Sequence, residues 1–163
     1  MSESFDFSDN IWIGDSGASC HYCNSDEGLF DTKVISDKIT VANGKKMQGI
    51  KIGKLRCDVK QRDGISFQIT PQEVKFVPEL WINLFSINKA LKNGFQIGSD
   101  GIIIQLTKET TRLAFDQVVN KKNGFVSGVQ LLPLRIQTAS NVMDKSETKL
   151  EISKLQQTLR HCG

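Results

Sequence analysis

The sequence is poor in tyrosine, tryptophan and proline, and it has no long apolar run. Among 163 residues there are one Tyr, two Trp and three Pro. The longest wholly apolar run, residues 101–104, is far too short to span a bilayer. The acidic N-terminus also lacks the basic start and the apolar stretch of a secretory signal. We therefore expect a soluble, cytoplasmic chain that makes no use of a membrane.

Positive charge is present but not concentrated. The formal net charge is +3, and the Lys and Arg residues are spread along the chain without a dense block. A barrel that binds nucleic acid would need aromatic residues interleaved with basic ones, and Tyr and Trp are too few here to supply them. We therefore expect no nucleic acid as a partner. The hydrophobic fraction of 39% and the charged fraction of 24% are typical of a folded, soluble domain.

Cysteine is sparse as well, and without a secretory signal we expect the four thiols to stay reduced. Cys20 and Cys23 form a C-x-x-C pattern that encloses His21 and is half of a typical zinc site. No second pair of ligands follows at zinc-finger spacing, and Cys57 stands alone. The alternative is that these are small residues on a strand directly after a turn. We predict no metal and no cofactor.

Short strand-like segments broken by turns dominate the sequence from residue 11 onward. Alternation of apolar and polar residues within them is typical of half-buried strands. Asn43-Gly44 and Asp63-Gly64 are strong signals for hairpin turns. The predicted strands cover residues 11–13, 39–42, 47–58, 65–69, 73–77, 95–97, 102–106, 113–115 and 125–129. This pattern predicts a mainly β fold, built as a small closed or sandwich domain.

One helix interrupts the strands. Leu84, Ile87 and Leu91 repeat at helical spacing, with Asn83 as a candidate N-cap. Asn93-Gly94 supplies a stop signal. We predict a helix over residues 83–91 with its three apolar residues in the core.

The composition divides the chain into three parts. Residues 1–10 are polar and expected to be disordered. Residues 11–133 form the β domain. Residues 134–163 are a polar, linker-like tail in which residues 149–159 carry Ile152, Leu155 and Leu159 on one helical stripe. The predicted architecture is thus a β domain followed by a partly helical C-terminal tail.

The strongest chemical signal is Asp15-Ser16-Gly17-Ala18, which closely follows the apolar strand 11–13. Asp, Ser and Gly are also favoured turn residues, so an ordinary turn is the alternative. In an aspartic protease, such a turn at the end of a buried strand aims a carboxylate into a cleft. The glycine lets a second turn approach closely, and the hydroxyl can hydrogen-bond across to it. We therefore predict Asp15 as the catalytic residue, with Ser16, Gly17 and Ala18 completing the active-site turn.

This chemistry needs two carboxylates, and the sequence has a single D-[ST]-G triplet. Two carboxyl groups about 3 Å apart cannot both ionise, so they share one proton. The ionised group draws a proton from a water that attacks the peptide carbonyl, and the protonated group donates to the developing oxyanion. If Asp15 is catalytic, the second carboxylate is Asp15 of another copy. The hypothesis therefore entails a symmetric homodimer.

Several blocks around this turn resemble a known family. Residues 12–21, WIGDSGASCH, resemble the W-[IV]-x-D-S-G-A-[ST]-x-H signature of Copia-type retrotransposon Pol polyproteins. The similarity continues in order with VANG at 41–44, IKIG at 50–53, VKFVPEL at 74–80, NLFSI at 83–87 and NGF at 93–95. Together these blocks cover roughly residues 11–97.

The resemblance implies a retropepsin-like aspartic protease domain, which is a small closed β-barrel with one short helix and a flap hairpin over the active site. The helix would pack under the active-site turn, and His21 would make a structural hydrogen bond. By position the flap comprises Met47, Gln48, Gly49, Ile50, Lys51, Ile52 and Gly53, with its two glycines giving mobility. An ordinary exposed hairpin is the alternative for this segment.

For function, the resemblance implies an endopeptidase that acts as a homodimer on the peptide substrates of its own Gag-Pol polyprotein. Such an enzyme would work in the cytoplasm, inside the virus-like particle of the retrotransposon. An alternative from a different class is a degenerate or domesticated β-barrel module that serves protein interaction without catalysis. The intact Asp15-Ser16-Gly17-Ala18 favours the protease, because drift would readily destroy a buried Asp.

Overall fold

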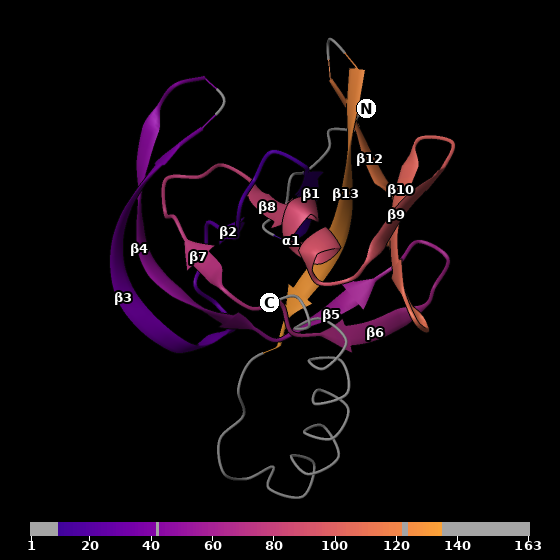
Figure 1. Ribbon diagram of the computed structural model, residues 1–163, viewed down its shortest axis with the longest axis horizontal. Helices are drawn as coiled ribbons and strands as arrows, with labels where there is room; N and C mark the ends of the chain where they lie inside the picture. Colours follow the sequence, from indigo (N-terminus) through magenta and orange to yellow (C-terminus); the bar gives the residue numbers. More distant parts are fainter. Residues whose placement is uncertain (1–9, 42, 122–123, 135–163) are drawn as a thin grey trace, which may run out of the picture.

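The computed structural model describes residues 10–41, 43–121 and 124–134 (Figure 1). This part of the chain is mainly β, as predicted, with one short helix. The strands are β1 (Ile11–Asp15), β2 (His21–Cys23), β3 (Leu29–Thr40), β4 (Lys46–Leu55), β5 (Cys57–Lys60), β6 (Ser66–Ile69), β7 (Val74–Phe76), β8 (Asn83–Ser86), β9 (Gln96–Asp100), β10 (Ile103–Lys108), β11 (Thr111–Phe115), β12 (Gln117–Lys121) and β13 (Gly124–Pro133), and the helix is α1 (Ile87–Lys92).

Two sheets make up the fold. The larger has ten strands in the order β3-β4-β7-β2-β8-β1-β13-β5-β6, with β12 paired to β13, and the smaller has the order β11-β10-β9. Figure 1 shows the larger sheet curling around α1, with β3 and β4 on one side and β5 and β6 on the other. Within the described strands, β3 and β6 are the two ends of this strand order and do not pair with each other.

The prediction of a closed barrel is therefore not supported. Closure needs every strand to have two neighbours, and the edge strands β3 and β6 each have one. The hairpin turns were predicted correctly because their signals are local. Gly44 and Gly64 both have the positive φ that such turns require, +84° and +93°.

Strand β1 lies in the middle of the larger sheet. It pairs in parallel with β8 and antiparallel with β13, so that Asp15 lies opposite Ser86 in the register. Its residues Ile11, Trp12 and Ile13 are buried, and the predicted strand at this position is confirmed. The buried strand thus delivers the D-S-G turn to a fixed place at the carboxyl ends of β1 and β8.

The helix begins later than predicted. Residues 83–86 form strand β8, and Ser86, not Asn83, caps α1 by accepting the Lys89 N–H on its hydroxyl at 3.0 Å. Pairing with β1 accounts for the difference, since it gives the backbone of this segment sheet partners. Ile87 is buried, but Leu91 is 37% exposed and so is not the core residue that the periodicity predicted.

Three apolar clusters fill the interior. The main one joins β1, β5, β8 and α1 to β10, β11 and β13, and its fully buried members include Phe85, Leu106, Phe115 and Leu131. A second cluster of Ala18, Tyr22, Met47, Val77 and Leu80 lies next to the D-S-G turn, which supplies Ala18. The third is Ile11, Ile13 and Ile82.

Two parts of the predicted organisation lie wholly or almost wholly outside the described residues. They are the N-terminal segment 1–10, of which only Asn10 is described, and the tail 134–163, of which only Leu134 is described. Within residues 10–41, 43–121 and 124–134, no helix combines the length and the hydropathy needed to cross a membrane.

Candidate functional site

The D-S-G turn begins at the last residue of β1. Asp15 is half-buried, Ser16 and Gly17 are exposed, and Ala18 is buried. The Gly17 N–H donates to the Asp15 carboxylate at 2.8 Å, which orients the carboxylate within its own turn. All four predicted turn residues therefore lie together at one end of the central strand.

Asp15 opens onto a cavity of about 950 Å³. The turn forms one wall with Asp15, Gly17, Ala18 and Ser19. The other walls come from β3 and the start of the hairpin loop, from the segment that precedes β8, and from single residues of β8, β2 and β7. They are Ser36, Asp37, Lys38, Ile39, Thr40, Val41, Asn43, Leu80, Trp81, Ile82, Leu84, Tyr22 and Lys75. We call this space the Asp15 cleft. Its volume is in the range of peptide or small-molecule sites.

The hairpin at the cleft is the one that the resemblance identified, but its cleft-facing residues differ. The predicted flap residues Met47–Gly53 lie on β4, and none of them lines the cavity. The wall comes from Ser36 to Val41 on the first arm, most of which belongs to β3. Sequence reasoning missed these residues, and the available signal was their position directly before the Asn43-Gly44 turn.

The two glycines of the predicted flap have a packing role in the structure. A Cβ on Gly53 would lie 2.8 Å from the Phe30 carbonyl oxygen and 2.7 Å from a Thr32 methyl group. A Cβ on Gly49 would lie 3.1 Å from Ile39 Cδ1. Both positions allow β3 and β4 to approach closely, which any side chain at residue 53 would prevent.

The lining of the cleft includes both apolar and charged side chains. Trp81, 60% exposed, lines it together with Leu80 and Ile82. Opposite charges meet where Lys75 Nζ lies 2.8 Å from Asp37 Oδ2, linking β7 to β3. The hydrogen bond from this ammonium to Asp37 raises the pKa of Lys75, and burial opposes the rise. The cleft thus combines apolar side chains with an ion pair and one further carboxylate, Asp15.

His21 lies behind the turn and does not face the cleft. The residue is 5% exposed, and its ring lies 4.4 Å, centroid to centroid, from the Phe85 ring at a tilt of 47°. Burial, with a smaller contribution from the positive charge of Lys89, lowers the pKa of His21 to about 3. The predicted structural hydrogen bond is present, since the Ser86 N–H donates to His21 Nδ1 at 3.0 Å.

The cysteines separate into different surroundings. Cys23 and Cys57 belong to the main cluster, whereas Cys20 packs against the cluster next to the turn. Burial raises the pKa of the Cys23 thiol to about 12 and also raises that of Cys57. In the described residues no three His, Cys, Asp or Glu side chains gather as a metal site would require.

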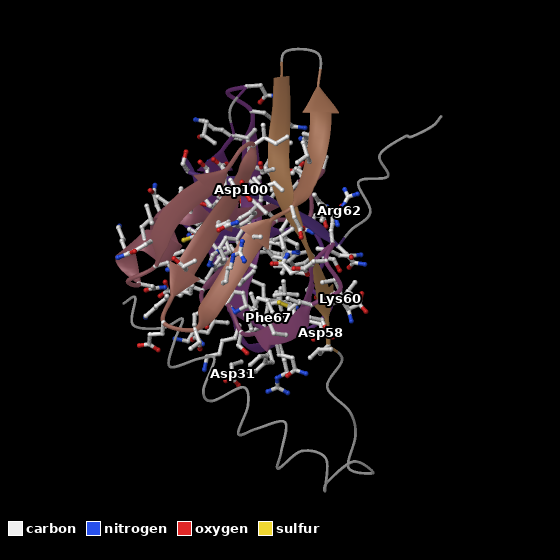
Figure 2. All side chains as sticks on the ribbon, turned by 90° about the vertical axis from the view of Figure 1, so that its right-hand side faces the viewer. Asp31, Asp58, Lys60, Arg62, Phe67 and Asp100 are labelled. Atoms are coloured by element: carbon white, nitrogen blue, oxygen red, sulfur yellow. The ribbon has the colours of Figure 1, made fainter. Side chains whose placement is uncertain are left out.

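A second, smaller cavity of about 400 Å³ lies between the β5–β6 hairpin and β11, and Phe67 and Asp116 help to line it. In Figure 1 these strands lie across the molecule from β3 and β4. Figure 2 turns this side to the viewer and shows Asp58, Lys60, Arg62 and Phe67 on it. No residue of the D-S-G turn lines this cavity, so it is separate from the Asp15 cleft.

The comparison with protein families bears on identity. The sequence model of one family, described as Pol polyprotein, beta-barrel domain, matches residues 12–95, which is just over half of the chain. The chain belongs to this family. Comparison with curated proteins and with solved structures gives no match.

Membership confirms the coarser part of the sequence interpretation. The chain belongs to the beta-barrel domain family of retrotransposon Pol polyproteins, and the larger sheet of its described residues is open. The matched range begins at Trp12 in β1 and ends at Phe95 after α1, so it contains the D-S-G turn, the β3–β4 hairpin, the segment 80–84 and the helix. Every residue that lines the Asp15 cleft therefore lies within the family's own range.

Proposed function

We propose that this Pol β-barrel domain is a Copia-type, retropepsin-like aspartic endopeptidase that processes its own polyprotein as a homodimer. The observation that carries the proposal is the placement of Asp15. It ends a buried central strand, lies in a D-S-G-A turn, and opens onto a cleft of about 950 Å³ beside a long hairpin. A peptide is a substrate of suitable size for such a cleft.

The single chain supplies one carboxylate of the required pair, and the exposure of the turn supports completion by a second copy. Ser16 and Gly17 are on the surface, and a Cβ on Gly17 would meet only the Asp15 carboxylate, at 3.4 Å. A second turn can therefore approach closely about a two-fold axis. The two Asp15 side chains would then share one proton, one serving as the base toward water and the other as the acid toward the peptide oxygen.

The test is cleavage of a longer polyprotein chain that carries native flanking sequence, compared with its Asp15→Asn variant. Asn keeps an oxygen that can accept the Gly17 N–H, so the turn retains its hydrogen bond while losing the ionisable group. We expect processing at mildly acidic pH that falls roughly 10⁴-fold or more in the variant. The rate per chain should rise with protein concentration, because the dimer is the active species.

Asp63→Asn is a matched control. Asp63 also begins a turn and accepts a backbone N–H two residues later, from Ile65 at 2.9 Å, but it lies away from the cleft. This variant should process the polyprotein at the wild-type rate. Absence of cleavage between pH 4 and 7 in a folded, dimeric sample would instead favour the non-catalytic module that serves protein interaction.

A further inference from the structure

Two side chains from the β8–α1 junction hold the Asp15 turn from behind. The Ser86 hydroxyl donates to the Ala18 carbonyl at 2.7 Å, and the Asn88 amide donates to the Ser16 carbonyl at 2.7 Å. These two carbonyls lie on either side of Gly17. The start of the helix therefore fixes the path of the backbone directly after Asp15.

The orientation of the Ser86 hydroxyl is fixed by its surroundings. It is fully buried, and its oxygen also accepts the Lys89 N–H at 3.0 Å as the helix cap. Its single proton is thus directed to Ala18. Whatever fixes the backbone of Ser86 also fixes this hydrogen bond.

His21 fixes that backbone. Its Nδ1 accepts the Ser86 N–H at 3.0 Å, and its ring is held against Phe85, which in turn meets Phe115 edge-on at 5.6 Å. An imidazole can accept this bond only while Nδ1 carries no proton. Because burial lowers its pKa to about 3, His21 remains an acceptor in mildly acidic solution, where a histidine of ordinary pKa would be protonated.

We propose that His21 is a positioning residue for Asp15, acting through Ser86. As a neutral acceptor it holds the Ser86 backbone, the Ser86 hydroxyl holds the Ala18 carbonyl, and the turn keeps the carboxylate aimed into the cleft. The part of this inference that concerns catalysis rests on the proposed function. The part that concerns the coupling of His21 to the turn does not.

The matched pair His21→Asn and His21→Leu separates this role from simple filling of the core. The two new side chains have nearly the same size and shape, but only Asn retains an oxygen that can accept the Ser86 N–H. The first measurement is made on the 163-residue chain at pH 5 by NMR. In the wild type we expect the ring Nδ1 to be unprotonated and the Ser86 amide to exchange slowly with solvent.

In the Leu variant the Ser86 amide should exchange roughly tenfold faster, and the Gly17 and Ala18 amide signals should shift. In the Asn variant these changes should be small. If both variants behave alike, or if Nδ1 is protonated at pH 5 in the wild type, His21 does not act as the acceptor and the proposal is overturned.

The Ser86→Ala variant tests the hydrogen bond from Ser86 to the turn, even if His21→Leu fails to fold. It should shift the signals of the turn because the Ala18 carbonyl loses its donor, and an unshifted turn overturns the proposal.

The second measurement is cleavage of the flanked polyprotein by each variant. We expect kcat to fall roughly tenfold for His21→Leu with KM within about twofold, and to recover most of this loss in His21→Asn. Perturbed turn signals with wild-type kcat would overturn the positioning role. If the wild type itself does not cleave, the proposed function fails, and the NMR arm alone still decides whether His21 holds the turn.

Discussion

The first part of the molecule, residues 12–95, and the second, residues 96–134, contribute in different ways. Every residue that lines the Asp15 cleft and every recognisable motif belongs to the first part. The buried members of the cluster next to the turn, Ala18, Tyr22, Met47, Val77 and Leu80, also come from it alone. The second part has no motif, yet it supplies five of the sixteen buried residues of the main cluster: Leu106, Leu113, Phe115, Val129 and Leu131.

The sheet order makes this difference sharper. Strand β13, from the second part, lies between β1 and β5, two strands of the first part. It pairs with β1 from Ile11 to Ile13 and with β5 from Cys57 to Lys60. Among the described strands, no other connects the β5–β6 hairpin to the rest of the larger sheet. The site is thus encoded in one part, whereas the strand that carries it is held in place by both.

The largest expected effect follows from removing the second part. A chain that ends at residue 95 loses β13, leaves β1 with one neighbour and exposes the main cluster, so we expect no cooperative unfolding transition in urea. A chain that ends at residue 134 retains every described strand and is the control, for which we expect a single transition. Cooperative folding of residues 1–95 would show that the matched family range is self-sufficient and would break the comparison.

A single contact between the two parts should show the same dependence on a smaller scale. Phe115 is fully buried, and a Cβ built on Gly14 would lie 3.1 Å from its ring, so the second part packs directly against the strand that ends at Asp15. Phe115→Ala should lower the free energy of unfolding by about 3–5 kcal/mol. Ile97→Ala, on strand β9 of the same three-stranded sheet and 52% exposed, should change it by about 0.5 kcal/mol or less. Urea titration measures both, and similar values for the two variants would contradict the packing argument.

Local signals explain what the sequence predicted well. An apolar run before D-S-G located β1 and its turn, and the Asn43-Gly44 and Asp63-Gly64 turns located the β3–β4 and β5–β6 hairpins. Those features depend on a few adjacent residues. The boundary between β8 and α1 does not, because its apolar spacing suits a helix while pairing with β1 draws residues 83–86 into the sheet.

The rest of the site was hidden for a similar reason. Strand β3 is an edge strand with many exposed residues. Even its apolar Val34 is 89% exposed, so the apolar residues of this strand do not mark a buried face. Its contribution to the cleft follows from pairing with β4, not from its own pattern. The sheet order and the hydrogen bond between His21 and Ser86 depend on residues that are far apart in sequence. The periodicity of apolar residues within one segment therefore cannot predict them.

An intermediate effect is expected from pH, through His21, which belongs to the first part and packs on Phe85, the residue that meets Phe115 of the second part. His21 stays neutral when folded, because burial lowers its pKa from 6.5 to about 3. Below pH 6.5 the His21 side chain binds a proton in the unfolded chain but not in the folded chain, which favours unfolding. The free energy of unfolding therefore has its full value above pH 6.5 and decreases as the pH falls toward 3. Between pH 7 and 5 we expect a loss of about 2 kcal/mol in the free energy of unfolding.

Urea titration at several pH values measures this loss. The comparison is the His21→Asn variant, because an Asn side chain at position 21 does not titrate. The variant should show a flatter profile between pH 5 and 7. The charged group that acts on His21 is Lys89, which is paired with Glu73. A wild-type slope unchanged by the substitution would mean that the folded His21 takes up a proton as readily as the unfolded one.

The smallest effect is expected from the ion pair that crosses the cleft. Asp37 and Lys75 join β3 to β7 at 2.8 Å, but the Asp37 side chain is 44% exposed, so solvent weakens the attraction. A double-mutant cycle with Asp37→Asn and Lys75→Met should give a coupling of about 1 kcal/mol or less, and added salt should reduce it. The pair between Asp26 and Lys51, at 2.9 Å and similarly exposed, is the matched control outside the cleft. A coupling well above 2 kcal/mol for Asp37 and Lys75 alone would show that the cleft is held by its own charges, in which case the first part would need the second less than the shared core implies.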